Sequence, residues 1–263
     1  MKEKSDIDRI RNSGGHTTVG SEHDGAIMEM KNIAGRLLVI KERAIYEIVT
    51  ADSIDPERKN ANLPPMIQKI IIDRGTESEI VSRTLLTAIG LFKPEYIMAA
   101  VDCNIIISLM IDMLSEIYIL EKEISEYQQS ENDASAEYEI RKQEKAPYKL
   151  PSIVNLESRC KTIFQKADHV EQLLIDIITR VYPELKLTKQ SHFPNLYLEI
   201  KKLYGENDGF VKLLETASGF MQILRELRNG FDHRLDHTKA IDYQLQVNGD
   251  IIAPTIELNH KKV

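Results

Sequence analysis

The chain has 263 residues, of which 42% are hydrophobic, 29% charged and 6% aromatic, and its net charge is −7. This length and composition indicate a folded, helix-rich protein with one large domain or two small ones. The acidic balance argues against a general nucleic-acid coat, which needs an excess of Lys and Arg to displace counterions, and it restricts any RNA site to a small basic cleft.

The two cysteines, Cys103 and Cys160, lie far apart in the sequence, and each falls in a helical pattern. We therefore expect two buried free thiols in a reducing compartment, and neither a disulfide scaffold nor a cysteine-based zinc site. Residues 1–6 have no apolar segment behind them, so we expect no signal peptide and a cytoplasmic protein.

The first part of the chain is predicted to be a tail followed by helices. Residues 1–25 are polar, contain four glycines and lack apolar periodicity, which predicts a flexible N-terminal tail. Over residues 26–52 the apolar residues follow three-four spacing and predict the first helix. Residues 66–73 are apolar and short, which predicts one or two helical turns. A capping-box pattern at residues 76–79 predicts the start of another helix, which ends near residue 92.

A long helix is predicted over residues 94–128, and its middle is apolar almost all round. A membrane span is the alternative interpretation, but Asp102, Asn104 and Asp112 interrupt the run, and acidic residues near the centre of a bilayer are costly. We therefore expect a central core helix and no membrane association. Residues 129–150 are charged and poor in apolar residues, which indicates either a linker or an exposed extension of this helix.

The last part of the chain is predicted to contain three amphipathic helices and a hairpin. The helices cover about residues 152–181, 194–204 and 208–228. After His237 apolar and polar residues alternate, and the pair Asn248-Gly249 tolerates the positive φ of a tight turn, so a β-hairpin is expected there.

The expected fold class is all-α, a helical bundle with long central helices and a small C-terminal β-hairpin. Its expected domains are a flexible tail, an N-terminal helical part, a charged linker or exposed helix extension, and a C-terminal helical domain that includes the hairpin, over residues 1–25, 26–128, 129–150 and 151–263. One bundle over residues 26–263 is the alternative.

Chemically capable side chains gather at the end of the last predicted helix, where Arg228 and Asn229 are followed by Gly230, Asp232 and His233. Arg228 and His233 are about 140° apart around an ideal helix, so they converge only if the helix distorts or ends. Gly230 permits such a distortion because it lacks a Cβ. A guanidinium, an amide and an imidazole facing one cavity suit an anionic phosphate, since Arg supplies fixed charge and His transfers protons near neutral pH.

The same residues also have a purely structural interpretation. Arg228 and Asp232 have the i, i+4 spacing of a surface ion pair, Asn229-Gly230 has the composition of a helix stop, and His233 can be a half-buried histidine. His233 and His237 have the i, i+4 spacing of a two-histidine metal site, with aspartates nearby. No third ligand is assured, so we expect no metal and no cofactor.

The segment Leu-Arg-Asn-Gly-Phe-Asp-His at residues 227–233 resembles the R-x4–6-H motif of the HEPN superfamily. Those are helical-bundle proteins, and many are metal-independent ribonucleases of toxin–antitoxin, abortive-infection and CRISPR systems. Asn229 matches the polar residue that typically follows the arginine, and the resemblance covers about residues 152–242. Leu235 stands where toxins of the family that pair with a nucleotidyltransferase often carry Tyr, so that partnership is not implied.

The resemblance implies that Arg228 and His233 form a catalytic pair, with Asn229, Gly230 and Asp232 in support, and that two copies dimerise with their motifs facing one cleft. The implied function is a metal-independent endoribonuclease, in which a ribose 2′-OH attacks the adjacent phosphate, His233 transfers the proton and Arg228 stabilises the phosphorane charge. The implied partners are an RNA substrate and, for a toxin or antiviral effector, a cognate inhibitor or defence-system protein. The alternative is a catalytically inactive HEPN-like binding or regulatory module, which the acidic charge favours.

Overall fold

The computed structural model of the chain describes residues 6–13, 17–33, 35–98, 100–144, 149–188, 190–235 and 237–258. The chain divides into two compact units, Met1–Ser115 and Glu116–Val263. The boundary falls inside the helix α5 (Cys103–Gln143), which has 41 residues. This helix therefore contributes its first turns to one unit and its remainder to the other.

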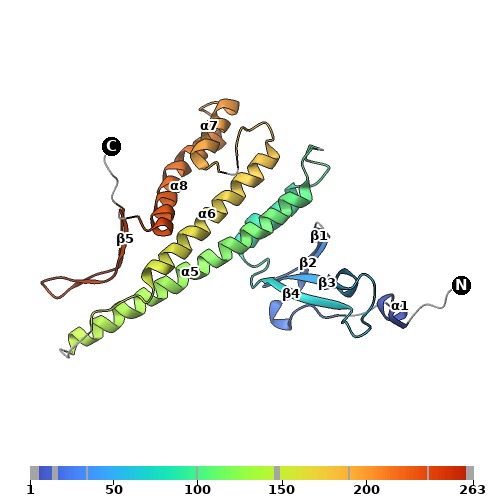
Figure 1. Ribbon diagram of the computed structural model, residues 1–263, viewed down its shortest axis with the longest axis horizontal. Helices are drawn as coiled ribbons and strands as arrows, with labels where there is room; N and C mark the ends of the chain where they lie inside the picture. The colour runs from blue at the N-terminus through green and yellow to red at the C-terminus, as the bar shows by residue number, and fades with distance from the viewer. Residues whose placement is uncertain are drawn as a thin grey trace. The chain divides into compact units, whose positions relative to one another are not determined.

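A four-stranded antiparallel sheet lies in the first unit, and it contradicts the predicted all-α fold (Figure 1). The strands neighbour one another in chain order and are β1 (Ile27–Ile33), β2 (Arg36–Lys41), β3 (Ile45–Thr50) and β4 (Met66–Ile72). The helix predicted over residues 26–52 and the helical turns predicted over residues 66–73 are therefore wrong. The chain combines helices with a sheet and is not a helical bundle with only a small hairpin.

The apolar run of β2 explains this error. Leu38, Val39 and Ile40 are fully buried, and a short continuous apolar run fits a buried helix as well as a buried strand when only periodicity is considered. The β-branched residues of the neighbouring strand, such as Ile45, pack well on a pleated surface and favour the sheet. Gly35, at φ +80°, stands between β1 and β2, where a side chain would be strained.

The polar N-terminal segment is bound to the first unit through Arg11. This residue ends the helix α1 (Asp6–Arg11). Its side chain is only 2% exposed, and its guanidinium lies 3.2 Å from the Asp52 carboxylate and 3.5 Å from that of Asp55. Part of the segment that was expected to be a flexible tail over residues 1–25 is therefore held by ion pairs of the buried Arg11 side chain.

Short helices complete the first unit: η1 (Glu22–Asp24), α2 (Ala51–Ile54), α3 (Glu79–Val81), the π-helical turn η2 (Ser82–Leu86) and α4 (Thr87–Leu91). The last three follow one another without a break and match the helix predicted to end near residue 92. The helix α5 continues through most of the predicted linker, up to Gln143. Among the described helices it is the one long and apolar enough to cross a membrane, a property that core helices of soluble proteins share.

The described residues of the second unit form three helices besides the latter part of α5: α6 (Leu156–Val181), α7 (Phe193–Tyr204) and α8 (Gly209–His233). They lie where the sequence predicts helices. Lys166 lies 2.9 Å from Glu116, and Arg159 lies 3.4 Å from Ser130, so α6 runs antiparallel beside α5 (Figure 1). The helices α7 and α8 pack on the end of α6 around a cluster that includes Leu196.

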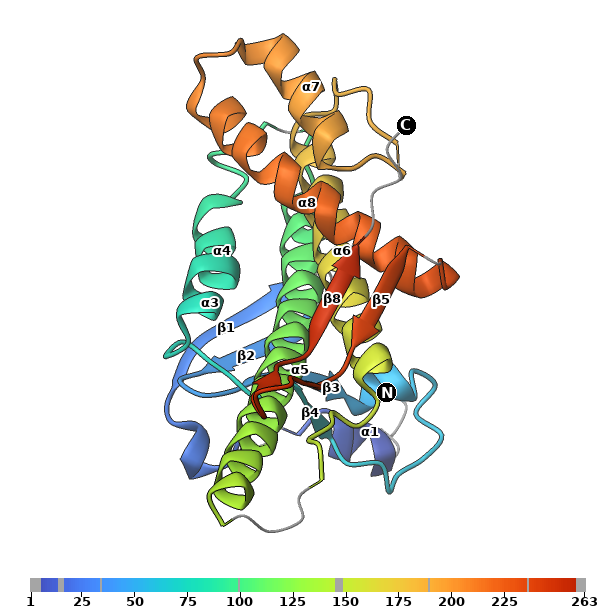
Figure 2. The same ribbon diagram turned by 90° about the vertical axis from the view of Figure 1, so that its left-hand side faces the viewer.

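The C-terminal hairpin is also present, and it is built from two short ladders. Strand β5 (Thr238–Ile241) pairs with β8 (Thr255–Leu258), and β6 (Gln244–Leu245) pairs with β7 (Ile251–Ile252) (Figure 2). Gly249 has the positive φ, +83°, expected at the turn. The hydroxyl of Tyr243 donates a hydrogen bond of 2.8 Å to the Glu131 carbonyl, which ties the hairpin to α5.

Candidate functional site

The helix α8 positions the whole motif, and it remains helical through Gly230. It begins at the N-cap Asp208, whose carboxylate accepts backbone N–H groups, and it ends after His233, where Arg234 adopts a left-handed conformation with φ +48°. Because the helix is not broken between them, Arg228 and His233 project about 140° apart. One copy of the chain does not bring the two predicted catalytic side chains together.

Gly230 has a packing role in place of the predicted hinge role. A Cβ built on Gly230 would lie 2.0 Å from Oγ1 and 2.4 Å from Cβ of Thr238 on β5. Such distances are far inside van der Waals contact, so the side chain of Thr238 occupies the space that a Cβ needs. Glycine therefore allows the hairpin to approach the last turn of α8 closely.

The guanidinium of Arg228 is paired with two carboxylates. Its Nε lies 3.0 Å from Asp232 and 3.6 Å from Asp168 on α6, and its NH1 group donates a 3.0 Å hydrogen bond to the Asn229 side chain. The Nε atom is buried and makes no well-directed hydrogen bond, so its contacts with the two carboxylates are mainly electrostatic. The i, i+4 ion pair of the structural interpretation is thus present, and α6 adds a second anion.

Asp232 serves as the centre of a small polar network between α8 and α6. Its carboxylate accepts a 2.6 Å hydrogen bond from Gln165 and lies 3.3 Å from the Lys161 ammonium. Burial raises the pKa of Asp232, but the hydrogen bonds from Gln165 and Lys161 and the charge of Arg228 outweigh it, so the pKa lies below its ordinary value. Asp232 is therefore ionised at neutral pH and holds the helices together.

His233 lies apart from this network. It is exposed on the last turn of α8, and it forms no hydrogen bond or ion pair with the described residues. His237, the second histidine of the metal site considered from the sequence, lies in the turn before β5, and Asp236 lies outside the described residues. Within the part of the chain that the structure describes, the motif therefore supplies one paired arginine and one exposed imidazole without a polar partner.

A polar pocket of about 400 Å³ opens between α6, α7 and α8, next to Arg228. Its polar lining consists of Glu171, His192, Asn195, Gln222, Arg225, Glu226 and Asn229. Arg225 and Asn229 are four residues apart and share one face of α8. Arg225 is exposed and forms no ion pair with the described residues, so its charge remains available to a ligand. Of the predicted site residues, only Asn229 lines this pocket.

A second group of side chains was missed by sequence reasoning. Asp168, Glu171 and His192 offer oxygen and nitrogen atoms that all lie within 4.8 Å of one another. Asp168 and Glu171 are one turn apart on α6, a spacing that the sequence displays, but His192 precedes α7 and reaches them only through tertiary packing. Glu171 accepts a 2.9 Å hydrogen bond from the Phe193 N–H, which fixes the start of α7 on α6.

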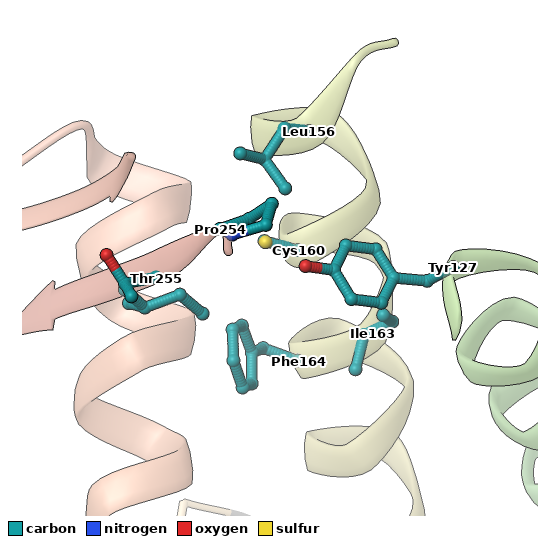
Figure 3. Close-up of a pocket in the computed structure, with 8 residues that line it drawn as sticks. Tyr127, Leu156, Cys160, Ile163, Phe164, Pro254 and Thr255 are labelled. Carbon is teal, nitrogen blue, oxygen red and sulfur yellow. The ribbon is translucent and has the colours of Figure 1, made fainter. Parts of the chain in front are cut away.

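An apolar pocket of about 310 Å³ lies elsewhere in the second unit, between Tyr127 of α5, the start of α6 and the hairpin residues Pro254 and Thr255. In Figure 3 the Tyr127 hydroxyl points toward the Cys160 sulfur, with Phe164 below them. Burial raises the pKa of the Cys160 thiol, and burial together with Glu131 raises the pKa of Tyr127 to about 12. Both groups are therefore protonated at neutral pH, which disfavours their action as a nucleophile or a general base.

No family model matches the chain, and no curated protein or solved structure matches it either.

Proposed function

We propose that the second unit is a catalytically inactive HEPN-like binding module, and that its polar pocket binds a nucleotide as the complex with a divalent cation. The observation that carries this proposal is the distribution of charge along α8. Arg225, which forms no ion pair with the described residues, and Asn229 line the pocket with a guanidinium and an amide, whereas Arg228 is paired with Asp168 and Asp232. Binding without turnover requires only Arg225 and Asn229, and it does not require that the side chains of Arg228 and His233 meet.

The lining suits the parts of a nucleotide. Arg225 can donate forked hydrogen bonds to a phosphate. The side-chain oxygen of Asn229 accepts from Arg228, which leaves its NH2 group free to donate to the same phosphate. Glu226 can accept from ribose hydroxyls, as acidic residues do in other nucleotide sites. The volume of about 400 Å³ lies within the usual range of small-ligand sites.

Calorimetric titration of the full chain with 5′-AMP and Mg²⁺ tests this function. Because a charge-assisted hydrogen bond contributes about 1.5–3 kcal/mol, Arg225→Ala is expected to weaken binding by roughly 10- to 100-fold. The matched control is Lys212→Ala, which removes an exposed cation from the same helix outside the pocket. Absence of nucleotide binding, or equal losses in the two variants, would refute the proposal.

A homodimeric endoribonuclease is the second candidate, and the exposed imidazole of His233, which forms no hydrogen bond or ion pair with the described residues, favours it. That side chain is exposed on the last turn of α8, where a second copy of the chain could approach it. Two facing motifs would supply two arginines and two histidines to one RNA phosphate, with a cognate inhibitor or a defence-system protein as the further partner that the HEPN resemblance implies. To bind the RNA phosphate, Arg228 would have to give up its ion pairs with Asp168 and Asp232, which would cost part of the binding free energy.

Cleavage of RNA in the presence of a chelator distinguishes the two candidates. A ribonuclease of this kind should be active without metal and lose activity in both Arg228→Ala and His233→Ala, and the active species should have twice the mass of one chain. Activity that is equal in wild type and both variants would instead indicate a contaminating nuclease. No cleavage, together with nucleotide binding that depends on Arg225, supports the binding module.

A further inference from the structure

We propose that Asp168, Glu171 and His192 bind one divalent metal ion, with Zn²⁺ as the probe of choice. The three side chains come from two separate parts of the second unit, α6 and the residue before α7, and their ligand atoms lie within 4.8 Å of one another. Two carboxylates and one imidazole form a ligand set that Zn²⁺ and similar transition metals accept. This binding is a property of the chain by itself and does not depend on a nucleotide.

The burial of Glu171 gives the first reason. This residue is only 2% exposed, and its Oε1 accepts the Phe193 N–H, but the other oxygen, Oε2, has the imidazole of His192 as its partner at 3.5 Å. No Lys or Arg of the described residues forms an ion pair with Glu171. The imidazole of His192 carries a charge only when it is protonated, and buried charges in proteins are normally paired or coordinate a metal. A cation at this point would complete the pairing.

The geometry gives the second reason. Two ligand atoms that bind one zinc ion at tetrahedral angles lie about 3.4 Å apart, given bonds of about 2.1 Å. The separation of Glu171 Oε2 from His192 Nδ1, 3.5 Å, matches this value. The cluster as a whole spans up to 4.8 Å, so a rotation of the partly exposed Asp168 side chain completes the set.

The Nδ1 atom of His192 already faces the cluster, because it lies 3.5 Å from Oε2 of Glu171. The side-chain nitrogen of Gln172 lies 3.1 Å from the same Nδ1, and which of the two atoms donates depends on the histidine tautomer. A metal ion requires the tautomer in which Nδ1 carries the lone pair. Binding costs the contact with Gln172 and the 3.6 Å contact of Asp168 with Arg228, which keeps its closer partner Asp232.

The metal would face the polar pocket, because Glu171 and His192 belong to its wall. Three protein ligands leave a fourth position open to water or to a ligand in the pocket. Without a metal, the Glu171 carboxylate in the wall of the pocket opposes the approach of a phosphate. A divalent cation bound to Glu171 removes this repulsion, which explains why nucleotide affinity should require a cation in the pocket.

The test is calorimetric titration of the chelator-washed full chain with Zn²⁺ alone. Wild type should bind one ion, and Glu171→Gln and Asp168→Asn should bind at least about 100-fold more weakly, since even partners of ligands contribute 10- to 100-fold. Glu171→Gln retains an oxygen that accepts the Phe193 N–H. If Glu171→Gln nevertheless unfolds, the test rests on Asp168→Asn, because the Asp168 side chain is less buried. The control, Asp176→Asn, removes an exposed carboxylate two turns from Asp168 on α6 and should bind as wild type does.

Failure of wild type to bind Zn²⁺, or unchanged affinity in both ligand variants, would overturn the metal site. Because no nucleotide is present in this titration, its outcome is separate from that of the nucleotide experiment. Substitution with Co²⁺ adds a spectroscopic check, since oxygen and nitrogen ligands give no thiolate charge-transfer band. Such a band would place the ion on Cys103 or Cys160 and would also contradict the proposal.

Discussion

The packing of the hairpin on α8 can be tested with two alanine substitutions in the same helix. Gly219 and Gly230 both lie inside α8, but their surroundings differ. A Cβ on Gly219 would meet nothing within 4 Å, whereas a Cβ on Gly230 would overlap Thr238 at 2.0 Å. Replacing either glycine with alanine removes the same entropic penalty of glycine in a helix, so the pair isolates the contact with the hairpin.

The expected magnitudes follow from these surroundings. Gly219→Ala should stabilise the fold by up to about 1 kcal/mol, the difference in helix propensity between the two residues. Gly230→Ala receives the same gain, but it must displace the buried Thr238, and overpacking of this kind costs about 1–3 kcal/mol or more. The two variants should therefore differ by at least about 1 kcal/mol, with Gly230→Ala the less stable.

Urea unfolding followed by circular dichroism measures the difference, because a change in midpoint at constant slope reports stability directly. A double variant that also carries Thr238→Gly should recover part of the loss, since the overlapping atoms are then absent. If Gly230→Ala is as stable as Gly219→Ala, Gly230 is not required for packing. The hinge role predicted from the motif would then regain support.

Three further outcomes are expected. In thermal melts, Arg11→Ala should destabilise the first unit by about 1–3 kcal/mol, because Asp52 and Asp55 then lose the buried arginine that contacts both. The control, Arg9→Ala, changes a side chain that is 79% exposed and should alter stability by less than about 0.5 kcal/mol. The folded-state pKa of Asp232 lies below its ordinary value of 3.8. The ionised carboxylate therefore contributes to the free energy of unfolding above the unfolded-state pKa, and this contribution is lost as the pH falls through the folded-state pKa. In acid titrations of the free energy of unfolding, Asp232→Asn should therefore show a smaller loss of stability below about pH 4 than wild type does. Cys160, buried and with a raised pKa, should react with iodoacetamide more slowly than the half-buried Cys103, as mass spectrometry of single-cysteine variants would show; faster reaction of Cys160 would contradict its burial.

The second unit was predictable because its signals are local. The helices α6, α7 and α8 each repeat an apolar face over several turns, and Asp208 caps α8 as a short polar residue before a helix should. Asn248-Gly249 marked the hairpin turn through the backbone preference of its own residues. Such signals depend on neighbours in the sequence, so one sequence suffices to read them.

The sheet of the first unit was not predictable in the same way. Its second strand is apolar on both faces, and such a run has no period that distinguishes a strand from a helix turn. The β-branched residues of β3 were a usable signal, but three-four spacing over residues 26–52 competed with it. Pairing of β3 with β4 across residues 51–65 is a long-range contact, which local patterns do not encode.

The candidate site was only partly predictable, and the reason lies in its partners. The motif identified Arg228 and His233, but a motif contains no information on α6, which supplies Asp168 to Arg228 and Lys161 and Gln165 to the network around Asp232. Likewise, His192 meets Glu171 only because the segment before α7 folds back on α6. The charged groups that neutralise or complete a site come from distant parts of the sequence. Spacing within the motif therefore does not show that the Arg228 guanidinium is already paired with a carboxylate of another helix.

The two carboxylates at Arg228 offer a last way to separate a structural role from a catalytic one. If Arg228 binds an RNA phosphate, Asp168 and Asp232 compete with that phosphate for the guanidinium. The double variant Asp168→Asn/Asp232→Asn should then bind RNA more tightly or cleave it faster. If Arg228 only joins α8 to α6, the same variant should unfold at lower urea concentration and gain no activity. Filter binding with a short single-stranded RNA and urea unfolding of the same preparation measure both quantities. Increased RNA affinity with unchanged stability would overturn the structural role, since it would show that the ion pairs restrain a ligand site and contribute little to the fold.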